Sequence, residues 1–284
     1  MITDKEANIV YFSEQILNAK YLDAFNRIKL ILDKHKVKYD FLKETKDIWC
    51  RDYMPIQINQ GKFIQFRYEP SYLLEELDLK SITKDVLKAN KLDATFSDIN
   101  LDGGNIVRSS DSVIITNRVF KENNESKEIL LAKLETILET KVYLIPDITN
   151  DMTGHSDGHV RFIDDKTVLV NSLDQELNYW QDGFKKMIED SGLSYIEMPW
   201  VSYSDKKHKE SAIGIYVNYL EIGNLIVFPI FEIDGNRDKE ALKVIKEAFP
   251  NNIIEPVNIK EIANEGGLLN CISWTINVQF NRNT

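Results

Sequence analysis

The residues best suited to chemistry are a cysteine near the C-terminal end of the chain and two acidic segments far upstream. Cys271 ends the glycine-containing segment 265–271 (EGGLLNC), directly before an apolar run of strand type. The upstream segments are residues 49–52 (WCRD) and 154–157 (GHSD). Together they supply a thiol that can attack carbon, an imidazole that can carry protons and carboxylates that can accept paired N–H groups. This set suits a planar cation that is open to attack at carbon, which describes a guanidinium group.

The composition argues against several classes of partner. Of the 284 residues, 43% are hydrophobic and 28% are charged, which is ordinary for a soluble globular protein. The net charge of −10 argues against nucleic acid as a partner and favours small cations. No apolar run reaches about 18 residues, so we expect no membrane span. Since the chain has two cysteines and no signal-peptide pattern at its start, we expect a cytoplasmic protein without a disulfide framework.

Helical and strand patterns alternate along the chain. The helix-like segments are residues 13–35, 80–91, 124–140, 174–191 and 238–249. The strand-like runs between them are residues 94–96, 112–116, 142–145, 167–170, 195–198 and 225–228. The pattern is two strands, a helix and another strand, repeated five times, and the end runs 8–12 and 274–278 could complete one unit by closing a ring. A two-domain α/β protein could alternate similarly, but no Pro/Gly-rich linker divides the chain. We therefore expect one domain over residues 1–284.

Four motifs occur in a fixed order over nearly the whole chain: WCRDYMP at 49–55, LDGGN at 101–105, GHSD at 154–157 and GGLLNC at 266–271. In this order they resemble the motifs of the agmatine deiminase and bacterial peptidylarginine deiminase family of guanidino-group-modifying enzymes. The resemblance implies an α/β fold, a five-bladed α/β propeller (the pentein fold) of ββαβ units around a pseudo-five-fold axis. It also implies a cofactor-free hydrolase that releases ammonia from a small cationic guanidino substrate.

The resemblance further implies roles for four side chains. Cys271 would be the nucleophile, His155 the general acid and base, and Asp52 and Asp157 would grip the guanidinium group. The chain departs from the family pattern in three respects. It has Asn270 and Leu268 where agmatine deiminases usually have His and Asn, it is shorter than typical members, and it lacks their Trp-Pro-rich N-terminal segment.

A second group of residues is expected to line the substrate site: Trp49, Arg51, Asp102 and Gly267. Gly267 would let the backbone approach a ligand closely, whereas Trp49 could equally belong to the core. Arg51 could bind a substrate carboxylate, orient a catalytic carboxylate or simply pair with the neighbouring acid. Asp102 could orient His155, although a cap on the adjacent glycine turn is the favoured interpretation.

Two further residues have competing interpretations. His159 also forms an acid–His pair with Asp157, but it begins an apparent strand and is interpreted as pocket rim or strand end. A metal held by His155, Asp157 and His159 is not expected, because this spacing is not a recognised closed site. Cys50 could form an inhibitory disulfide with Cys271, although a core position is the favoured interpretation.

Three functions stay open from the sequence. The favoured function is an iminohydrolase that converts agmatine or a similar small arginine derivative into a ureido product and ammonia. The compact chain lacks extra domains for gripping a polypeptide, which favours a small substrate over peptidylarginine. An amidinotransferase of the same fold is the second function. A non-catalytic ligand-binding protein that keeps the fold is the third, in view of Leu268 and Asn270.

Overall fold

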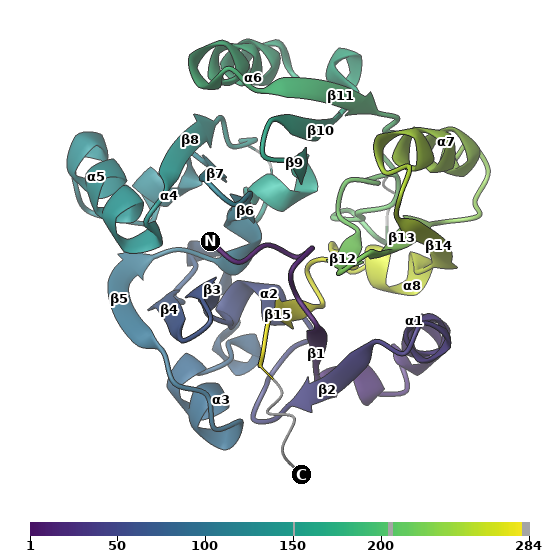
Figure 1. The fold of residues 1–284 in the computed structure, drawn as a ribbon, viewed down its shortest axis with the longest axis horizontal. Coiled ribbons are helices and arrows are strands. Elements are labelled where there is room, and N and C mark those ends of the chain that lie inside the picture. The colour runs from purple at the N-terminus through teal and green to yellow at the C-terminus, as the bar shows by residue number, and fades with distance from the viewer. Residues whose placement is uncertain (150, 204–206, 280–284) are drawn as a thin grey trace.

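The computed structural model describes residues 1–149, 151–203 and 207–279. Within these residues the chain forms five three-stranded sheets arranged as blades around a central axis (Figure 1). Each blade has an antiparallel strand pair, and its third strand runs parallel to the second after a helical crossover. This is the ββαβ unit predicted from the sequence, repeated five times.

The strands, given blade by blade from the axis outwards, are β15 (Trp274–Ile276), β1 (Ile9–Ser13) and β2 (Lys38–Leu42); β3 (Ile56–Asn59), β4 (Lys62–Arg67) and β5 (Thr95–Asn100); β6 (Val107–Arg108), β7 (Ser112–Thr116) and β8 (Lys141–Ile145); β9 (Val160–Asp164), β10 (Thr167–Asn171) and β11 (Ser194–Met198); β12 (Leu220–Ile222), β13 (Leu225–Ile230) and β14 (Ile253–Asn258). The strands β15, β3, β6, β9 and β12 thus lie nearest the axis in Figure 1. The preceding chain segments therefore meet around that axis.

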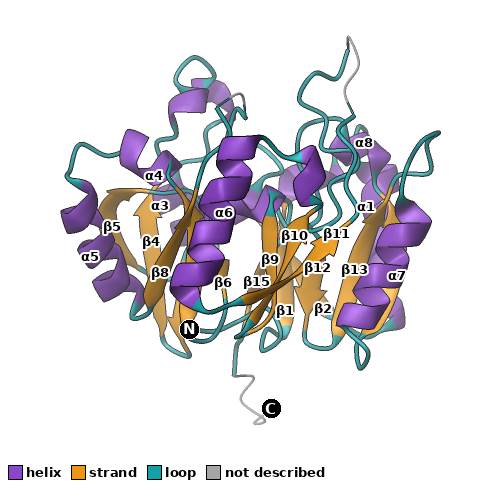
Figure 2. Ribbon diagram, turned by 90° about the horizontal axis from the view of Figure 1, so that it is seen from above, coloured by secondary structure: helices purple, strands orange, loops and turns teal. Residues whose placement is uncertain are grey.

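One long helix crosses over in each blade and covers the outside of the ring (Figures 1 and 2). These helices are α1 (Leu22–Lys34), α3 (Thr83–Ala89), α5 (Lys127–Leu138), α6 (Asn178–Ser191) and α7 (Asp238–Ala248). In α7, Ala241 and Ile245 are buried at helical spacing, and Pro250 follows the end of the helix. The helix predicted over residues 13–35 is instead two elements. A short 3₁₀ helix, Glu14–Leu17, is capped by the Ser13 hydroxyl and precedes α1.

The ring closes between the two ends of the chain. Strand β1 pairs antiparallel with β15, with Ile9 opposite Ile276 and Tyr11 opposite Trp274. The predicted closure by the first and last strand-like runs is therefore confirmed. It also fixes the segment before β15, which carries Cys271, against the first blade.

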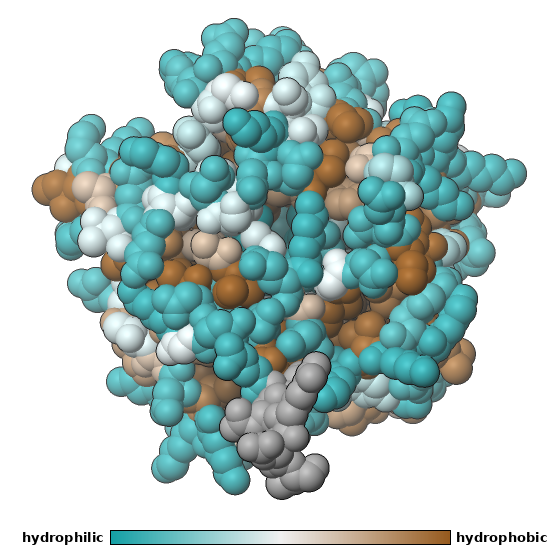
Figure 3. Space-filling model, viewed as in Figure 1, coloured by the Kyte–Doolittle hydropathy of each residue, from teal (hydrophilic) through white to brown (hydrophobic). Residues whose placement is uncertain are grey.

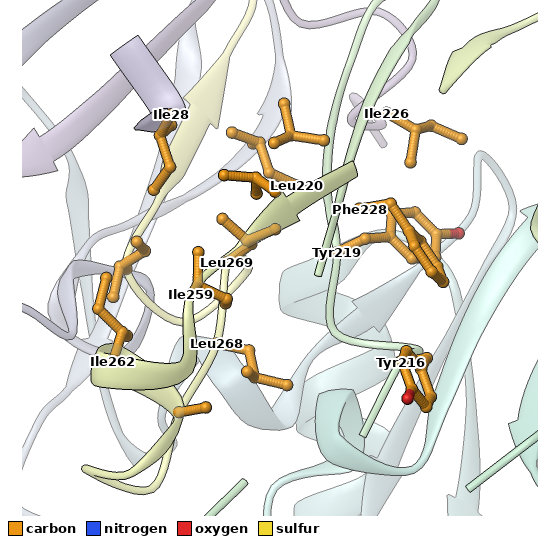
Figure 4. Close-up of a cluster of buried hydrophobic side chains, with 14 of the residues drawn as sticks. Ile28, Tyr216, Tyr219, Leu220, Ile226, Phe228, Ile259, Ile262, Leu268 and Leu269 are labelled. Atoms are coloured by element: carbon orange, nitrogen blue, oxygen red, sulfur yellow. The ribbon is translucent and has the colours of Figure 1, made fainter. Parts of the chain in front are cut away.

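The hydrophobic core is divided among the blades and the spaces between them. The largest buried cluster joins the fifth blade to α1 and to the segment before β15. Figure 4 shows Leu268 and Leu269 in this cluster, near Ile259 and Ile262. Hydrophilic residues cover most of the face shown in Figure 3, with smaller hydrophobic patches between them. In the part of the chain that the structure describes, no helix is long and apolar enough to cross a membrane.

Candidate active site

Each blade contributes one short segment to the site, and each segment lies just before the innermost strand of its blade. The side chains concerned are Asp52 on α2 (Cys50–Tyr53) before β3, Asp102 before β6, His155 and Asp157 at the 3₁₀ turn Ser156–Gly158 before β9, Asn218 before β12 and Cys271 before β15. Equivalent ends of the five inner strands meet around the axis, so residues far apart in sequence converge there.

The thiol of Cys271 lies against a carboxylate and an amide. Its Sγ is 3.7 Å from Oδ2 of Asp157, and Nδ2 of Asn218 donates to it at 3.2 Å. The amide of the preceding Asn270 donates to the same Asp157 oxygen at 2.7 Å. Burial raises the pKa of the Cys271 thiol well above its ordinary value, and the charges of Asp157 and Asp52 raise it further. The residues around the sulfur therefore favour the thiol over the thiolate.

The imidazole of His155 is held between two carboxylates. Its Nε2–H donates to Oδ2 of Asp102 at 2.9 Å, and its Nδ1 is 3.6 Å from Oδ1 of Asp52. The same oxygen of Asp102 accepts the hydroxyl of Tyr72 at 2.8 Å. Burial alone would lower the pKa of His155, but the charge of Asp52 and the hydrogen bond to Asp102 raise it above its usual value. The two carboxylates therefore favour the protonated imidazole, with Nδ1 as the nitrogen not engaged by Asp102.

Glycine at position 104 lets Asp52 and His155 come together. The Gly104 N–H donates to Oδ1 of Asp52 at 3.0 Å. A Cβ at this position would lie 2.5 Å from that oxygen and 2.5 Å from Nδ1 of His155. Burial raises the pKa of Asp52; the imidazole opposes this shift, and the nearby Asp102 charge adds to it. Gly104, the second glycine of the second motif, is thus required for close approach of the backbone to the acid–imidazole pair.

The segment that carries Cys271 is anchored from several directions. Leu268 and Leu269 are fully buried in the core cluster, and the Arg51 N–H donates to the Cys271 carbonyl at 3.1 Å. Gly267 faces the Trp49 ring so closely that a Cβ would lie 2.4 Å from a ring carbon. Leu268, which departs from the family pattern, thus fills a core position.

The structure shows what the side chains of Asp102 and Arg51 contact. Asp102 occupies the N-terminal position of the turn Gly103–Asn105, but its carboxylate makes no cap and bonds His155 instead. The favoured interpretation as a turn cap was therefore wrong. The guanidinium of Arg51 is 3% exposed, its Nε donates to the Asn270 carbonyl, and its NH1 lies 4.0 Å from Asp4. Arg51 accordingly holds the backbone before the cysteine. Its contact with substrate stays a prediction.

The positions of His159 and Cys50 decide between their competing interpretations. His159 is buried and lies 3.7 Å from Asp151 and 3.5 Å from Glu176, with its ring against Trp180. It lies at the start of the inner strand of the fourth blade, as expected for a strand end. Cys50 is fully buried, and its thiol donates to the Ile272 carbonyl at 3.1 Å, which is a core position.

No group of three or more His, Cys, Asp or Glu side chains among the described residues could hold a metal ion.

Asn218 is the site residue that sequence reasoning missed. Besides contacting the sulfur, it accepts the Asn270 N–H at 3.0 Å and donates to the Asp157 carbonyl at 3.2 Å. Four motifs were found in a five-fold repeat, and Asn218 supplies the position in the remaining blade. It is the one polar side chain in the run 215–220 (IYVNYL) just before an inner strand, which could have indicated it.

The chain is similar to proteins of known name in sequence and in structure. It matches the Porphyromonas-type peptidyl-arginine deiminase family over residues 3–276. A Mycoplasma capricolum protein named "Putative agmatine deiminase" is 26% identical over 68% of this chain, which spans 62% of the length of that relative. A protein of the same name from Photobacterium profundum is 24% identical over 82% of this chain and 75% of its own length.

Solved structures of the same fold cover almost the whole chain. The Campylobacter jejuni agmatine deiminase is 19% identical with a TM-score of 0.75, over 99% of this chain and 96% of its own. The Enterococcus faecalis agmatine deiminase is 17% identical with a TM-score of 0.75, over 96% and 93%. The likeness confirms the five-bladed α/β propeller of the pentein fold. Since the family match covers 3–276 and the motif residues converge at the axis, this chain belongs to the Porphyromonas-type peptidyl-arginine deiminase family.

Proposed function

We propose that this protein is a cofactor-free guanidine deiminase that converts a small guanidino compound, agmatine in the first place, into a ureido product and ammonia. The observation that carries the proposal is the position of the Cys271 sulfur, 3.7 Å from the Asp157 carboxylate in an acidic site. That site also holds Asp52 and the imidazole of His155.

Recognition in this proposal depends on charge. Asp52 and Asp157 are buried carboxylates that raise the pKa of the neighbouring thiol, so the empty site disfavours a thiolate. A guanidinium carries only N–H donors. When bound, it can donate paired hydrogen bonds to both carboxylates. Its positive charge would offset their repulsion and lower the pKa of Cys271. The substrate therefore helps to create its own nucleophile.

In the first half of the reaction the thiol proton passes to solvent as the cation binds, and the Cys271 thiolate attacks the guanidinium carbon. The C–S bond forms and a tetrahedral adduct results. His155, whose protonated form the flanking carboxylates favour, gives its Nδ1 proton to a leaving nitrogen. The C–N bond breaks, ammonia leaves, and a covalent thiouronium stays on the sulfur.

In the second half of the reaction the neutral His155 takes a proton from a water molecule. The resulting hydroxide adds to the thiouronium carbon. Collapse of the adduct breaks the C–S bond, and the hydroxyl proton of the adduct passes to the leaving sulfur, which restores the Cys271 thiol. The ureido product is released with the oxygen of that water. Asp102 keeps the ring oriented through Nε2 during both proton transfers.

The names of the relatives support agmatine as the first compound to test. One solved relative is the C. jejuni agmatine deiminase with a Cys-to-Ser substitution and substrate bound, at 18% identity. The family name instead points to peptidyl-arginine, so both substrate classes belong in the test. We further propose that the protein acts in the cytoplasm, where both of its cysteines, which are free, would stay reduced.

The test is incubation of the purified protein with agmatine, free arginine, peptidyl-arginine and simple guanidines, with ammonia and ureido product measured separately. We expect both products from one of these compounds, and neither from the Cys271→Ala variant. Including an added amine reveals amidino transfer through the product mass. Absence of ammonia and ureido product with every compound, from a folded protein whose Cys271 is reduced, would contradict the proposal.

A further inference from the structure

The N-terminal segment crosses the middle of the ring in Figure 1, and its Asp4 is buried among the blades. Oδ2 of Asp4 accepts NH2 of Arg161 at 2.5 Å, from β9. Its Oδ1 accepts NH2 of Arg108 at 2.8 Å, from β6, and the Thr275 hydroxyl at 2.6 Å, from β15. One carboxylate thus joins the inner strands of three blades.

Charge explains why this carboxylate is held so firmly. The guanidinium groups of Arg51, Arg108 and Arg161 all face Asp4, at 4.0, 2.8 and 2.5 Å. Burial would raise the pKa of Asp4, but Arg108 and Arg161 outweigh it and hold that pKa well below its usual range. Without Asp4 these buried cations would lose their shared counter-ion.

Arg161 connects Asp4 to the site with the two arms of one guanidinium. While NH2 binds Asp4, NH1 donates to Oδ1 of Asn270 at 2.7 Å. Arginine can only donate, so the amide oxygen of Asn270 must face it and the amide nitrogen must face away. That nitrogen donates to Oδ2 of Asp157 at 2.7 Å, the oxygen that lies 3.7 Å from the Cys271 sulfur.

We propose that Arg161, anchored by Asp4, and Asn270 are positioning residues of the deiminase site, which together fix the Asp157 carboxylate beside the Cys271 sulfur. The inference rests on the proposed function for its catalytic consequence, but the geometry it concerns can be measured without turnover. If the Asn270 amide no longer donates, the thiol becomes a principal donor to Oδ2 of Asp157. The proton is then held more tightly on sulfur, and the carboxylate is free to turn.

Arg108 provides a matched control for Arg161. Both arginines are buried, both lie on inner strands and both bind Asp4, but of the two only Arg161 bonds Asn270. In Arg161→Lys the charge is kept, but one ammonium cannot reproduce the planar fork that joins Asp4 to Asn270. In Arg108→Lys the same change removes a bond to Asp4 and leaves the amide untouched. Both variants are therefore expected to lower the melting temperature.

Two measurements separate a positioning role from a merely structural one. The first is kcat with the substrate of the wild-type enzyme. The second is the rate at which iodoacetamide alkylates Cys271 as a function of pH, since the charges of Asp157 and Asp52 raise the pKa of this thiol. We expect Arg161→Lys and Asn270→Ala to lower kcat by about tenfold or more and to move the alkylation midpoint to higher pH. We expect Arg108→Lys to change neither quantity.

The inference is overturned if the two lysine variants have equal kcat and equal alkylation profiles, or if Asn270→Ala matches the wild type in both. Asn270→Ala also carries the test if Arg161→Lys does not fold. Should the wild-type protein hydrolyse no guanidine, the proposed function fails, and the alkylation profiles still decide whether this chain of contacts positions the thiol.

Discussion

Replacing Gly104 by alanine tests the geometry of the acid–imidazole pair without removing any catalytic group. The new Cβ would lie 2.5 Å from Oδ1 of Asp52 and 2.5 Å from Nδ1 of His155, whereas ordinary contact begins near 3.4 Å. Each of these two atoms must therefore move away from the new Cβ by roughly 0.9 Å, the difference between these distances. Gly104 has no positive φ, so the backbone itself tolerates alanine.

A displacement of about 1 Å at reacting groups typically costs on the order of a hundredfold in rate. We therefore expect Gly104→Ala to lower kcat for the best guanidine substrate by about a hundredfold. Overpacking should lower the free energy of unfolding by about 1–3 kcal/mol, which leaves the fold intact. The assay is steady-state ammonia release, with circular dichroism and thermal unfolding on the same samples.

Gly158 is the matched control, because it adjoins Asp157 in the same site. It also lacks a positive φ, and a Cβ there would meet nothing within 4 Å. Gly158→Ala is expected to keep the wild-type kcat. A folded Gly104→Ala protein with wild-type kcat would refute the reasoning, because the acid and imidazole would then not need the contact that the structure shows.

Three further outcomes follow from the site and its surroundings. Asn218→Ala removes the amide that lies 3.2 Å from the sulfur. We expect this variant to lower kcat about tenfold with little change in melting temperature. An unchanged kcat would exclude Asn218 from the chemistry. Burial would lower the pKa of His159, but the nearby carboxylates of Asp151 and Glu176 outweigh this and raise that pKa from 6.5 to about 9. The stability that this provides, on the order of 3 kcal/mol, is complete below pH 6.5 and is lost as pH rises through 9. Unfolding free energies measured over that range should fall in the wild type and fall less in His159→Gln; equal slopes would contradict the assignment. Because the Cys50 thiol lies in the core, Cys50→Ala should keep full activity. For the same reason, the wild-type protein should be equally active after mild oxidation and in the presence of reductant. Inactivation that reductant reverses would support the disulfide hypothesis instead.

Much of the fold could be predicted because alternating patterns are local. The run 112–116 is strand β7 with the same bounds, and the helix expected over 238–249 ends one residue earlier. The strands β3 and β4 were not identified, since buried Gln57 and Gln65 interrupt their apolar pattern. The side-chain amides of both glutamines donate to backbone carbonyls, which the apolar pattern cannot reveal.

The site could be predicted where motif residues act directly, and less well where residues act through others. Asp157 and Cys271 lie in contact, as the motifs indicated. The partners of Asp102 and Arg51 depend on which blades face each other, so the cap favoured for Asp102 was wrong and the buried partners of Arg51 could not be foreseen. Nothing in the sequence indicated a role for Asp4. Its contacts with three arginines form only when the chain closes the ring.

The most direct test of the central claim is the mass of Cys271 during turnover. Acid quenching of the enzyme with agmatine or whichever guanidine it hydrolyses, followed by digestion and mass spectrometry, should show a peptide containing Cys271 that has gained the mass of the substrate less ammonia. The same peptide should lack this adduct when substrate is omitted. Sustained ammonia release by a Cys271→Ala variant, at a rate near that of the wild type, would contradict the account.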